Sequence, residues 1–472
     1  MGSKEEERKE TFFLFERDFI KSQEFDVMKK YKFVFWNLSG DFLGLAQRIQ
    51  KEGYECFSYY EPELTTDDRD TGKGIIYLVD DLFDTLNNFK DHKDEVIILV
   101  DDNSKGDTCD YLRSEGWKVI GSSHFADMAE HERELGNALA KKIGLDTPPT
   151  WTFTDFASGT KFLEDLGKKY PDAGFVFKGN GIKMAGGAKT YVSRNLADAL
   201  WFMNWVEKDQ EVHHYKVEEF ELQLKIKGIE ADFASWFNGK MFVNNIALDF
   251  EEKKLNGLGS AQGCWGQVEC FQPAVKNKFF RKYLSKLAPI LAKDGEINEW
   301  AANTIVEEKD NIPKFLEWTP RFGWDSTMGE LCILQAMGKS IAEFFIAIAE
   351  GKQLPKDYFP DYGYSCSLRL YSESSGTEGK DVCGKPIHWD PKVEDNLWWY
   401  SIRERDGQYE LTDNPFGVVT AFDKDLETAI KKAYEIVDPK NGLLSTPDIM
   451  YNEHIGERSL KEKDKLIKLG WF

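Results

Sequence analysis

The sequence has no long uninterrupted apolar run. None approaches the roughly 18 consecutive apolar residues that a membrane-spanning helix needs. The first ten residues, MGSKEEERKE, are too acidic for a secretory signal peptide. We therefore expect a cytoplasmic protein that has no membrane partner.

Cysteine and histidine are scarce, with seven of each in 472 residues. The cysteines are scattered, odd in number and never in CxxC spacing, which favours reduced thiols over disulfides or zinc ligands. His213 and His214 have no third ligand at metal-binding spacing. The sequence therefore predicts neither a disulfide framework nor a zinc centre.

Basic residues are outnumbered. There are 61 lysines and arginines against 82 aspartates and glutamates, which gives a formal net charge of −21. Such a surplus of negative charge repels nucleic acid phosphates. The basic clusters at 276–282 and 461–468 are short and mixed with acidic or apolar residues, as on solvated helix faces. We expect no nucleic acid partner.

Apolar residues make up 41% of the chain and aromatic residues 14%, which is enough for the cores of two to four packed units. Within the first 120 residues, short apolar runs alternate with helical patterns, which predicts a parallel sheet built from βαβ units. The predicted strands are Lys32–Trp36, Tyr54–Tyr59, Ile75–Val79, Val96–Val100 and Trp117–Ile120.

Several helix boundaries can be predicted. The turn at Ser39 and Gly40 lacks a full G-x-G-x-x-G; it is either a plain turn or a site for a phosphate or carboxylate at a helix N-terminus. Asp127 to Glu130 have capping-box spacing for a helix running to Lys142. A proline pair at 148–149 then predicts a domain boundary. The apolar pattern from Met328 to Glu350 predicts one long helix.

The strand Phe175 to Lys178 leads into the small-residue hairpin GNGIKMAGGAKT and a second strand at Tyr191. The backbone amides of such a turn can close over phosphates, and the lysine beside it adds a positive charge. This is not a Walker loop, because G-K-[ST] before a helix is absent. A plain hairpin turn is the alternative interpretation.

The stretch from Lys314 to Asp325, KFLEWTPRFGWD, ends a predicted strand in charged residues. Alternate residues of a strand share a face, so Glu317, Thr319 and Arg321 would point the same way, with Phe315 on the same face. A carboxylate can hold Mg²⁺ against phosphates, and a guanidinium can grip a carboxylate or phosphate. The alternative is a surface ion pair on a strand that turns at a proline.

The order of these motifs resembles that of the ATP-grasp superfamily. The motifs are the parallel-sheet domain, the lysine strand with its glycine-rich hairpin, the Val-Glu-Glu-Phe segment at 217–220 and the Glu-x-Thr-x-Arg turn. Within it, the sequence is most similar to the phosphoribosylamine-glycine ligase family. The matching segments are best at 101–144, which contains L-R-S-E-G-W-K-V-I-G, and at 315–325. The similarity covers roughly residues 30–350.

The resemblance implies an α/β and α+β multidomain ATP-grasp fold. It implies an N-terminal extension at 1–29, a parallel-sheet domain preceding the ATP-grasp unit at 30–147, a small lid subdomain at 148–217, a large subdomain at 218–352 and a small C-terminal α+β domain at 353–472.

The resemblance also implies roles for individual residues. Lys178 would bind ATP phosphates beneath the hairpin, and Arg321 would face a substrate carboxylate or acyl phosphate; these two are the candidate catalytic residues. Further candidates are Gly186, Gly187, Glu218, Glu219, Phe220, Glu221 and Glu230 for ATP, Gly323, Asp325, Gly263 and Gly266 for the substrates, and Glu317 and Thr319 for Mg²⁺ or Mn²⁺.

Two departures from the family pattern concern the metal and the acceptor. Thr319 replaces a metal-binding asparagine, and the family's acceptor loop GPNTGGMG is here GSAQGCWG, with a bulky Trp265. ATP handling is thus better preserved than amine recognition.

The expected activity is an ATP- and magnesium-dependent, amide-forming ligase of purine biosynthesis type, acting as a monomer or homodimer. It would join a small-molecule carboxylate, glycine by default, to phosphoribosylamine or a divergent amine through an acyl phosphate. The alternatives are an inactive nucleotide-binding scaffold and a carboxylase-type or carbamoyl-phosphate-type enzyme.

Overall fold

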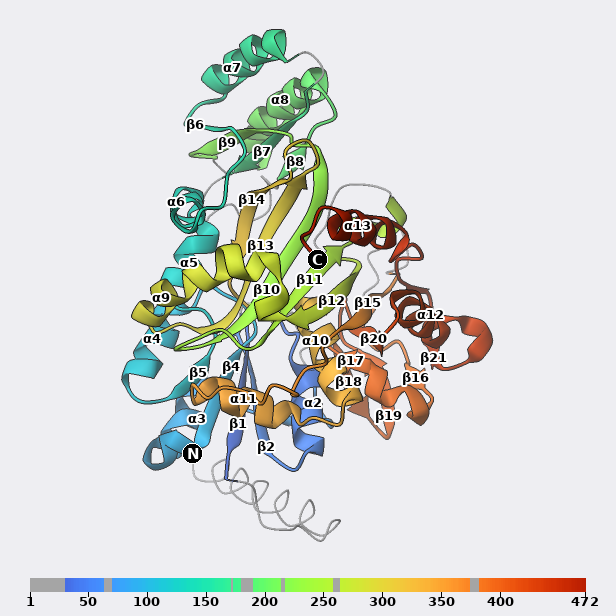
Figure 1. Ribbon diagram of the computed structural model, residues 1–472. Coiled ribbons are helices and arrows are strands. Elements are labelled where there is room, and N and C mark those ends of the chain that lie inside the picture. The colour runs from blue at the N-terminus through green and yellow to red at the C-terminus, as the bar shows by residue number, and fades with distance from the viewer. Residues whose placement is uncertain are drawn as a thin grey trace.

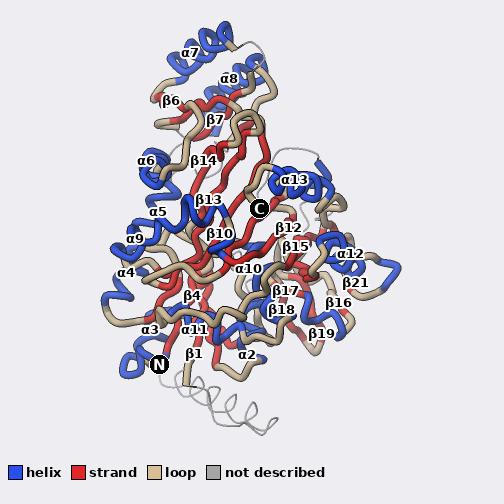
Figure 2. The backbone as a smooth tube through the Cα atoms, in the orientation of Figure 1, coloured by secondary structure: helices blue, strands red, loops and turns tan. Residues whose placement is uncertain are grey.

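The computed structural model describes residues 30–62, 70–170, 173–179, 190–213, 217–257, 264–373 and 382–472. The expected N-terminal extension and the candidate residues Gly186, Gly187 and Gly263 lie outside these ranges. A large body carries a smaller unit, containing α7 (Phe156–Lys169) and α8 (Leu196–His213), at its upper end in Figure 1. Figure 2 shows strands running through the body, with helices at its periphery.

The N-terminal domain contains a parallel sheet in the order β3-β2-β1-β4-β5, so the predicted parallel sheet is confirmed. Its central strands are fully buried because helices and neighbouring layers cover both faces. Its elements are β1 (Lys32–Asn37), α2 (Leu43–Lys51), β2 (Glu55–Tyr60), β3 (Tyr77–Leu78), α3 (Leu82–Asn88), β4 (Val96–Val100), α4 (Gly106–Ser114) and β5 (Lys118–Ile120).

Two helices follow where one was predicted. Helix α5 (His124–His131) is capped by Ser123, and α6 (Arg133–Ile143) ends at Gly144, whose φ is 89°. The predicted capping box at Asp127 is wrong. Asp127 lies within α5, and its carboxylate accepts a hydrogen bond from the backbone N–H of Gly106 at 2.7 Å. Its side chain thus ties α5 to the start of α4.

The smaller unit is an antiparallel sheet in the order β6-β9-β7-β8, with α7 and α8 packed on it. Its strands are β6 (Thr150–Phe153), β7 (Phe175–Gly179), β8 (Tyr191–Val192) and β9 (Phe220–Leu224). Because β9 lies between β6 and β7, the chain leaves this sheet after Leu224 and not at 218, where the large subdomain was expected to begin.

The largest sheet has the strand order β14-β13-β10-β11-β12-β15-β20-β17, with β22 beside β15. Its neighbouring strands are antiparallel. The strands are β10 (Gly228–Asn238), β11 (Asn245–Glu251), β12 (Gly266–Pro273), β13 (Ile297–Glu307), β14 (Ile312–Thr319), β15 (Gly363–Ser372), β17 (Leu397–Trp399), β20 (Gly417–Asp423) and β22 (Ile449–Met450).

The C-terminal segment has the expected α+β character, but its strands β15, β17 and β20 extend the large sheet and do not form a separate one. Trp471 and Leu466 are buried in one core with Phe279 and Tyr283, which lie far away in the sequence. The remaining elements are α9 (Ser285–Asp294), β16 (His388–Trp389), β18 (Ile402–Arg405), β19 (Gln408–Leu411), α12 (Leu426–Val437), β21 (Leu444–Ser445) and α13 (Glu457–Lys468).

The predicted long helix from Met328 to Glu350 is wrong. The chain forms α10 (Trp324–Ala336) and α11 (Ile341–Ala349), which meet at a bend of 116°. Gly338 has a φ of 67°, and Ser340 then caps α11. In the described part of the chain, no single helix has the length and apolar composition to cross a membrane. Helices α10 and α11 have that length and composition only when they are taken together as a bent pair.

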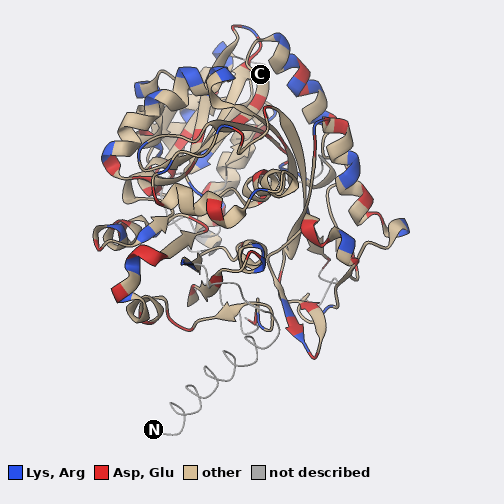
Figure 3. Cartoon of the chain, turned by 60° about the horizontal axis from the view of Figure 1, so that its bottom comes forward, with Lys and Arg blue, Asp and Glu red and all other residues tan. Residues whose placement is uncertain are grey.

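Charged residues of both signs are mixed along the outer helices (Figure 3). Helix α13 illustrates the pattern, because its sequence ERSLKEKDKLIK alternates acidic and basic side chains around a few apolar ones. The surface of this helix is therefore a solvated one of mixed charge.

Candidate functional site

A pocket between the smaller sheet and the edge of the large sheet collects several of the predicted residues. Lys178 of β7 and Glu221 of β9 are directly paired across the smaller sheet. Both line the pocket with Arg133 of α6 and Glu317 of β14. Charged side chains from four separate elements therefore face one space.

Lys178 is buried, and its Nζ donates a hydrogen bond to the carbonyl oxygen of Leu316 at 3.1 Å. Burial lowers the pKa of Lys178 to about 8, although the nearby carboxylate of Glu317 acts in the opposite direction. The positive charge of this ammonium group is thus only partly balanced by nearby carboxylates. It is suited to binding an anion.

A β-bulge in β14 sets the direction of Glu317. Asn303 of β13 pairs with Glu317 and Thr304 pairs with Phe315, so Leu316 is an extra residue in the ladder. The alternation of faces shifts at this point, and Phe315 packs in the same core as Trp318. The prediction that Phe315 shares a face with Glu317 is therefore wrong.

Glu317 is ionised in this setting. Burial acts to raise its pKa, but Lys178, Lys253 and Arg133 together hold the pKa below its ordinary value. The Nδ2 of Asn303 donates to Oε1 of Glu317 at 3.4 Å. An ionised carboxylate beside an amide is a fitting donor set for Mg²⁺, which usually takes one or two protein oxygens together with phosphates and water.

No group of three or more histidine, cysteine, aspartate or glutamate side chains in the described ranges is arranged as a complete metal site. Thr319, the second predicted metal ligand, is half-buried two residues after Glu317 on β14. It lies opposite Ala301, whereas Asn303 lies opposite Glu317. Asn303 therefore joins Thr319 as a candidate second ligand.

Arg321 follows β14 and is held by protein carboxylates. Its Nε lies 3.1 Å from Oε1 of Glu130 and 3.3 Å from Oδ1 of Asp102. About a quarter of the side chain is exposed. Both contacts are made by Nε, which is one of the donors that were predicted for a substrate carboxylate.

The described candidates for substrate binding, Gly323, Asp325 and Gly266, do not line the pocket. Asp325 is buried and forms an ion pair with Arg369 of β15, with Oδ1 2.8 Å from Nη2. Gly323 is the N-cap of α10. Gly266 is the first residue of β12, where an added Cβ would lie 2.6 Å from the carbonyl oxygen of Ser367. Asp325 and Gly266 therefore have structural positions inside the large domain.

The side chains of the predicted adenine segment, 218–221, also point to different surroundings. Glu218 is exposed and Glu219 half-buried, whereas the side chain of Phe220 is fully buried in the core of the smaller unit. Only the backbone of Phe220 is left to contact a nucleotide. Glu221 faces the pocket.

The predicted ribose carboxylate, Glu230 of β10, already has a cationic neighbour. The Nζ of Lys253 lies 2.6 Å from Oε1 of Glu230. Lys253 and Arg133 are the cations that sequence reasoning missed. Arg133 has a detectable signal, the E-x-x-R spacing from Glu130, but Lys253 comes from a loop without a motif.

The turn at Ser39 and Gly40 is occupied from within. The carboxylate of Asp101, at the end of β4, accepts hydrogen bonds from the backbone N–H groups of Leu38 at 2.6 Å and Gly40 at 2.9 Å. It also accepts from the hydroxyl of Ser39 at 3.0 Å. The sequence left two interpretations of this turn, a plain turn or a site for a substrate anion. In the structure, the carboxylate of Asp101 occupies the position that such an anion would take.

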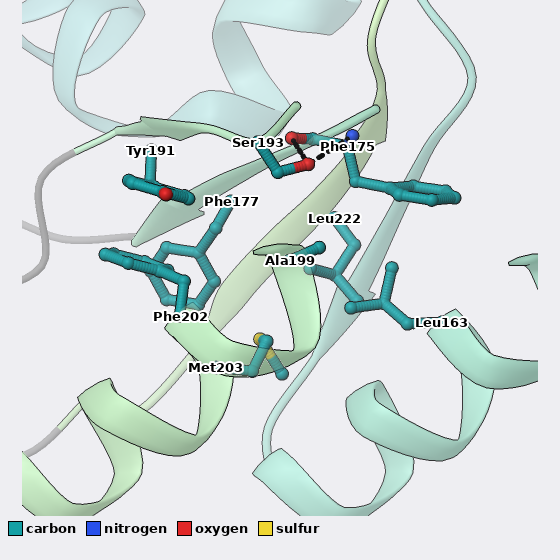
Figure 4. A pocket seen from close by; sticks show the side chains of 9 residues that line it. All are labelled: Leu163, Phe175, Phe177, Tyr191, Ser193, Ala199, Phe202, Met203 and Leu222. Carbon is teal, nitrogen blue, oxygen red and sulfur yellow. Dashed lines mark hydrogen bonds between the residues drawn. The ribbon is translucent and has the colours of Figure 1, made fainter. Parts of the chain in front are cut away.

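A second cavity lies inside the smaller unit and is lined mainly by apolar side chains (Figure 4). The rings of Tyr191 and Phe202 stack at a centroid distance of 3.9 Å. The hydroxyl of Ser193 accepts from the backbone N–H of Phe175 at 2.7 Å and donates to its carbonyl oxygen at 2.8 Å. This cavity is a packing gap in a core.

Comparisons with known proteins agree on the fold. No family model matches the sequence. The chain is 23% identical over 342 residues to a curated phosphoribosylamine-glycine ligase from Chlorobaculum tepidum, over 69% of this chain and 76% of that protein. A crystal structure of the same enzyme from Thermotoga maritima superposes with a TM-score of 0.64 and 16% identity, over 90% of this chain and 100% of that one. A biotin carboxylase from Campylobacter jejuni gives 0.61 and 15%, over 91% and 95%. The resemblance found in the sequence is thus confirmed.

Proposed function

We propose that this chain, which has the ATP-grasp fold, is an ATP-dependent ligase that joins a carboxylate to an amine through an acyl phosphate. The observation that carries the proposal is the meeting of Lys178 and Glu317 at one pocket. One residue supplies a buried cation, and the other supplies an ionised carboxylate. A magnesium-bearing nucleotide needs both.

The pocket residues take these roles. The ammonium of Lys178 binds a phosphate oxygen through a charge-assisted hydrogen bond. Arg133 lies beside it, and its Nε donates to the carbonyl oxygen of Gly179 at 3.1 Å, which fixes the end of the strand that carries Lys178. Glu221 and the backbone around 218–220 face the adenine, and Glu230 faces the ribose.

Glu317 is the principal carboxylate for Mg²⁺ or Mn²⁺, with Asn303 or Thr319 as the second oxygen ligand. When bound, the metal neutralises phosphate charge during transfer. The protein itself contributes position and electrostatics, because attack of the carboxylate on the γ-phosphate and of the amine on the acyl phosphate needs no covalent intermediate with the chain.

The substrates are part of the proposal. An amino acid, glycine by default, supplies the carboxylate, and phosphoribosylamine or a divergent amine accepts the acyl group. The support for an amino acid is the resemblance to the phosphoribosylamine-glycine ligases. Arg321 is proposed to contact the acyl phosphate with the donors that Glu130 and Asp102 leave available.

Trapping the acyl phosphate tests the proposal without knowledge of the amine. The full-length protein is incubated with ATP, Mg²⁺, hydroxylamine and one amino acid at a time, and hydroxamate and ADP are measured. We expect equal amounts of both with at least one amino acid. Glycine with phosphoribosylamine is then tested for amide formation.

Glu317→Gln should abolish hydroxamate formation, because the ionised ligand is lost. Glu164→Gln is the matched control: Glu164 is exposed on α7, away from the pocket, and its replacement should leave the rate unchanged. ATP binding without hydroxamate from any amino acid would contradict a ligase that uses amino acids and favour a nucleotide-binding scaffold.

A further inference from the structure

Three carboxylates form a row across the large sheet. Asp232 of β10 is paired with Asp249 of β11, and Asp249 is paired with Glu269 of β12. Directly paired residues point to the same face, and neighbouring strands lie about 4.8 Å apart. Their exposed fractions are 4%, 6% and 0%. The three acids are therefore close neighbours in the interior.

Further acids approach the row from β13 and α10. Glu330 of α10 and Glu299 of β13 both act on Asp249, and the pKa of Asp249 is well above its ordinary value because of burial and these like charges. Gly329 of α10 packs against the row so closely that an added Cβ would lie 2.6 Å from a carboxylate oxygen of Glu269.

Burial raises the pKa of Asp232, Asp249 and Glu269 well above the ordinary value, so the row as it stands is held protonated. Oδ1 of Asp232 and Oδ1 of Asp249 are buried without a hydrogen-bond partner among the described residues. The two carboxyl oxygens of Glu269 accept hydrogen bonds from the side chains of Gln267 and Ser365. By contrast, the chain pairs the equally buried Asp325 with Arg369. Buried ionised carboxylates are ordinarily paired, so a cation bound beside the row would let these carboxyl groups ionise.

Beside the row, an ammonium group is already bound by two further acids. Lys253 Nζ lies 2.6 Å from Oε1 of Glu230 and 3.6 Å from Oε2 of Glu251. Glu230 precedes Asp232 by two residues on β10, and Glu251 follows Asp249 by two on β11, so all four share a face. The side chains of Glu230 and Glu251 are about one-third exposed. These two acids are therefore more exposed than the row beside them.

Toward β14, the line of the row leads to the nucleotide pocket. Asp232 is paired with Asn303 of β13, and Asn303 is paired with Glu317 of β14. Asp232 is therefore two strand spacings, roughly 10 Å, from Glu317. A small molecule that reaches from Glu317 to Asp249 would place one end beside the proposed acyl phosphate.

We propose that the acceptor of the ligase reaction is a dicationic amine: one amino group is acylated beside Glu317, and a second ammonium or guanidinium group binds between Asp232, Asp249 and Glu269. This inference rests on the proposed function and names its acceptor class. An acceptor that carries a phosphate, such as phosphoribosylamine, would bring a negative charge and no second cation to these buried acids.

The acceptor class is tested by calorimetric titration of the full-length protein at pH 8. The probes are 1,4-diaminobutane and agmatine, with n-butylamine as the monocation and phosphoethanolamine as the phosphate-bearing amine. We expect the two dications to bind at least tenfold more tightly than n-butylamine and phosphoethanolamine not to bind. We also expect a dication to replace hydroxylamine as acceptor and to release ADP.

Asp249→Asn replaces a buried carboxyl group by an amide that cannot ionise, with little change in shape. We expect it to weaken dication binding at least tenfold, with a melting temperature at pH 8 no lower than that of the wild type. Glu296→Gln is the matched control, because Glu296 is also a fully buried acid but accepts a hydrogen bond from the backbone N–H of Ser123 at 3.2 Å, away from the row. It should leave dication affinity unchanged.

The outcomes separate this inference from the proposed function. If ATP binds and hydroxamate forms but no dication binds, or if Asp249→Asn binds dications as tightly as the wild type, the acceptor assignment is overturned and the ligase stands. If a dication binds but neither hydroxamate nor ADP forms with any amino acid, the ligase proposal fails, and the acceptor role fails with it.

Discussion

Replacing Lys178 by methionine is the most direct test of the pocket. The substitution keeps the length of the side chain and removes its charge. The buried ammonium donates to the Leu316 carbonyl at 3.1 Å and lies next to Glu317, so few other donors can take its place. A hydrogen bond to a charged group contributes about 1.5–3 kcal/mol. The dissociation constant for ATP should therefore rise about tenfold to a hundredfold.

The pH dependence of binding gives a second readout that a structural role would not produce. Because the pKa of Lys178 is lowered to about 8, the wild-type lysine carries its charge below pH 8 and loses it above. Binding of metal-free ATP should be constant below pH 8 and should weaken by up to about tenfold per pH unit above it. Lys178→Met should bind weakly, with no such change near pH 8.

Calorimetric or fluorescence titration with ATP between pH 7 and pH 9.5 measures both effects. Lys168→Met is the control, because Lys168 is an exposed lysine of α7 that pairs with Asp165. It should behave like the wild type. Unchanged ATP affinity in Lys178→Met, with the protein folded by circular dichroism, would refute the assignment of the pocket.

Three further predictions concern stability and are read from thermal or urea unfolding. Arg369→Met leaves Asp325 buried without its partner and should cost about 3–5 kcal/mol; a loss below 1 kcal/mol would contradict the ion pair. For Glu296, burial raises the pKa to about 7, so the unfolding free energy should fall by about 3 kcal/mol between pH 4.5 and pH 7 on this account, and Glu296→Gln should remove that part of the slope. Trp471→Ala should cost about 3–5 kcal/mol, because this ring packs 4.6 Å from the ring of Phe279; wild-type stability would contradict that packing.

Some features of the fold follow from short stretches of sequence. The apolar runs of β1 and β4 are buried strands, since Val34 and Ile98 lie fully inside a parallel sheet that is covered on both faces. The ends of helices are local as well: Gly144 in a left-handed conformation stops α6. Where a local pattern has one physical solution, the sequence is sufficient to predict it.

Predictions failed where distant partners decided the outcome. Phe315 left the face of Glu317 because a bulge at Leu316 interrupts the ladder with β13, and nothing in the letters around it marks that bulge. The carboxylate of Asp101 reached back across the first domain to the amides at Ser39 and Gly40. The contacts of Asp101 join residues about sixty positions apart, so no local pattern encodes them.

The sequence by itself determined the order of the motifs, and with it the resemblance to an ATP-grasp ligase and the choice of Lys178 and Glu317. Only the tertiary structure placed these two at one pocket and aligned Asp232, Asp249 and Glu269 into a buried row. The physical reason is register: which side chains face each other across a sheet depends on how strands pair, and pairing is fixed by the packing of the whole chain.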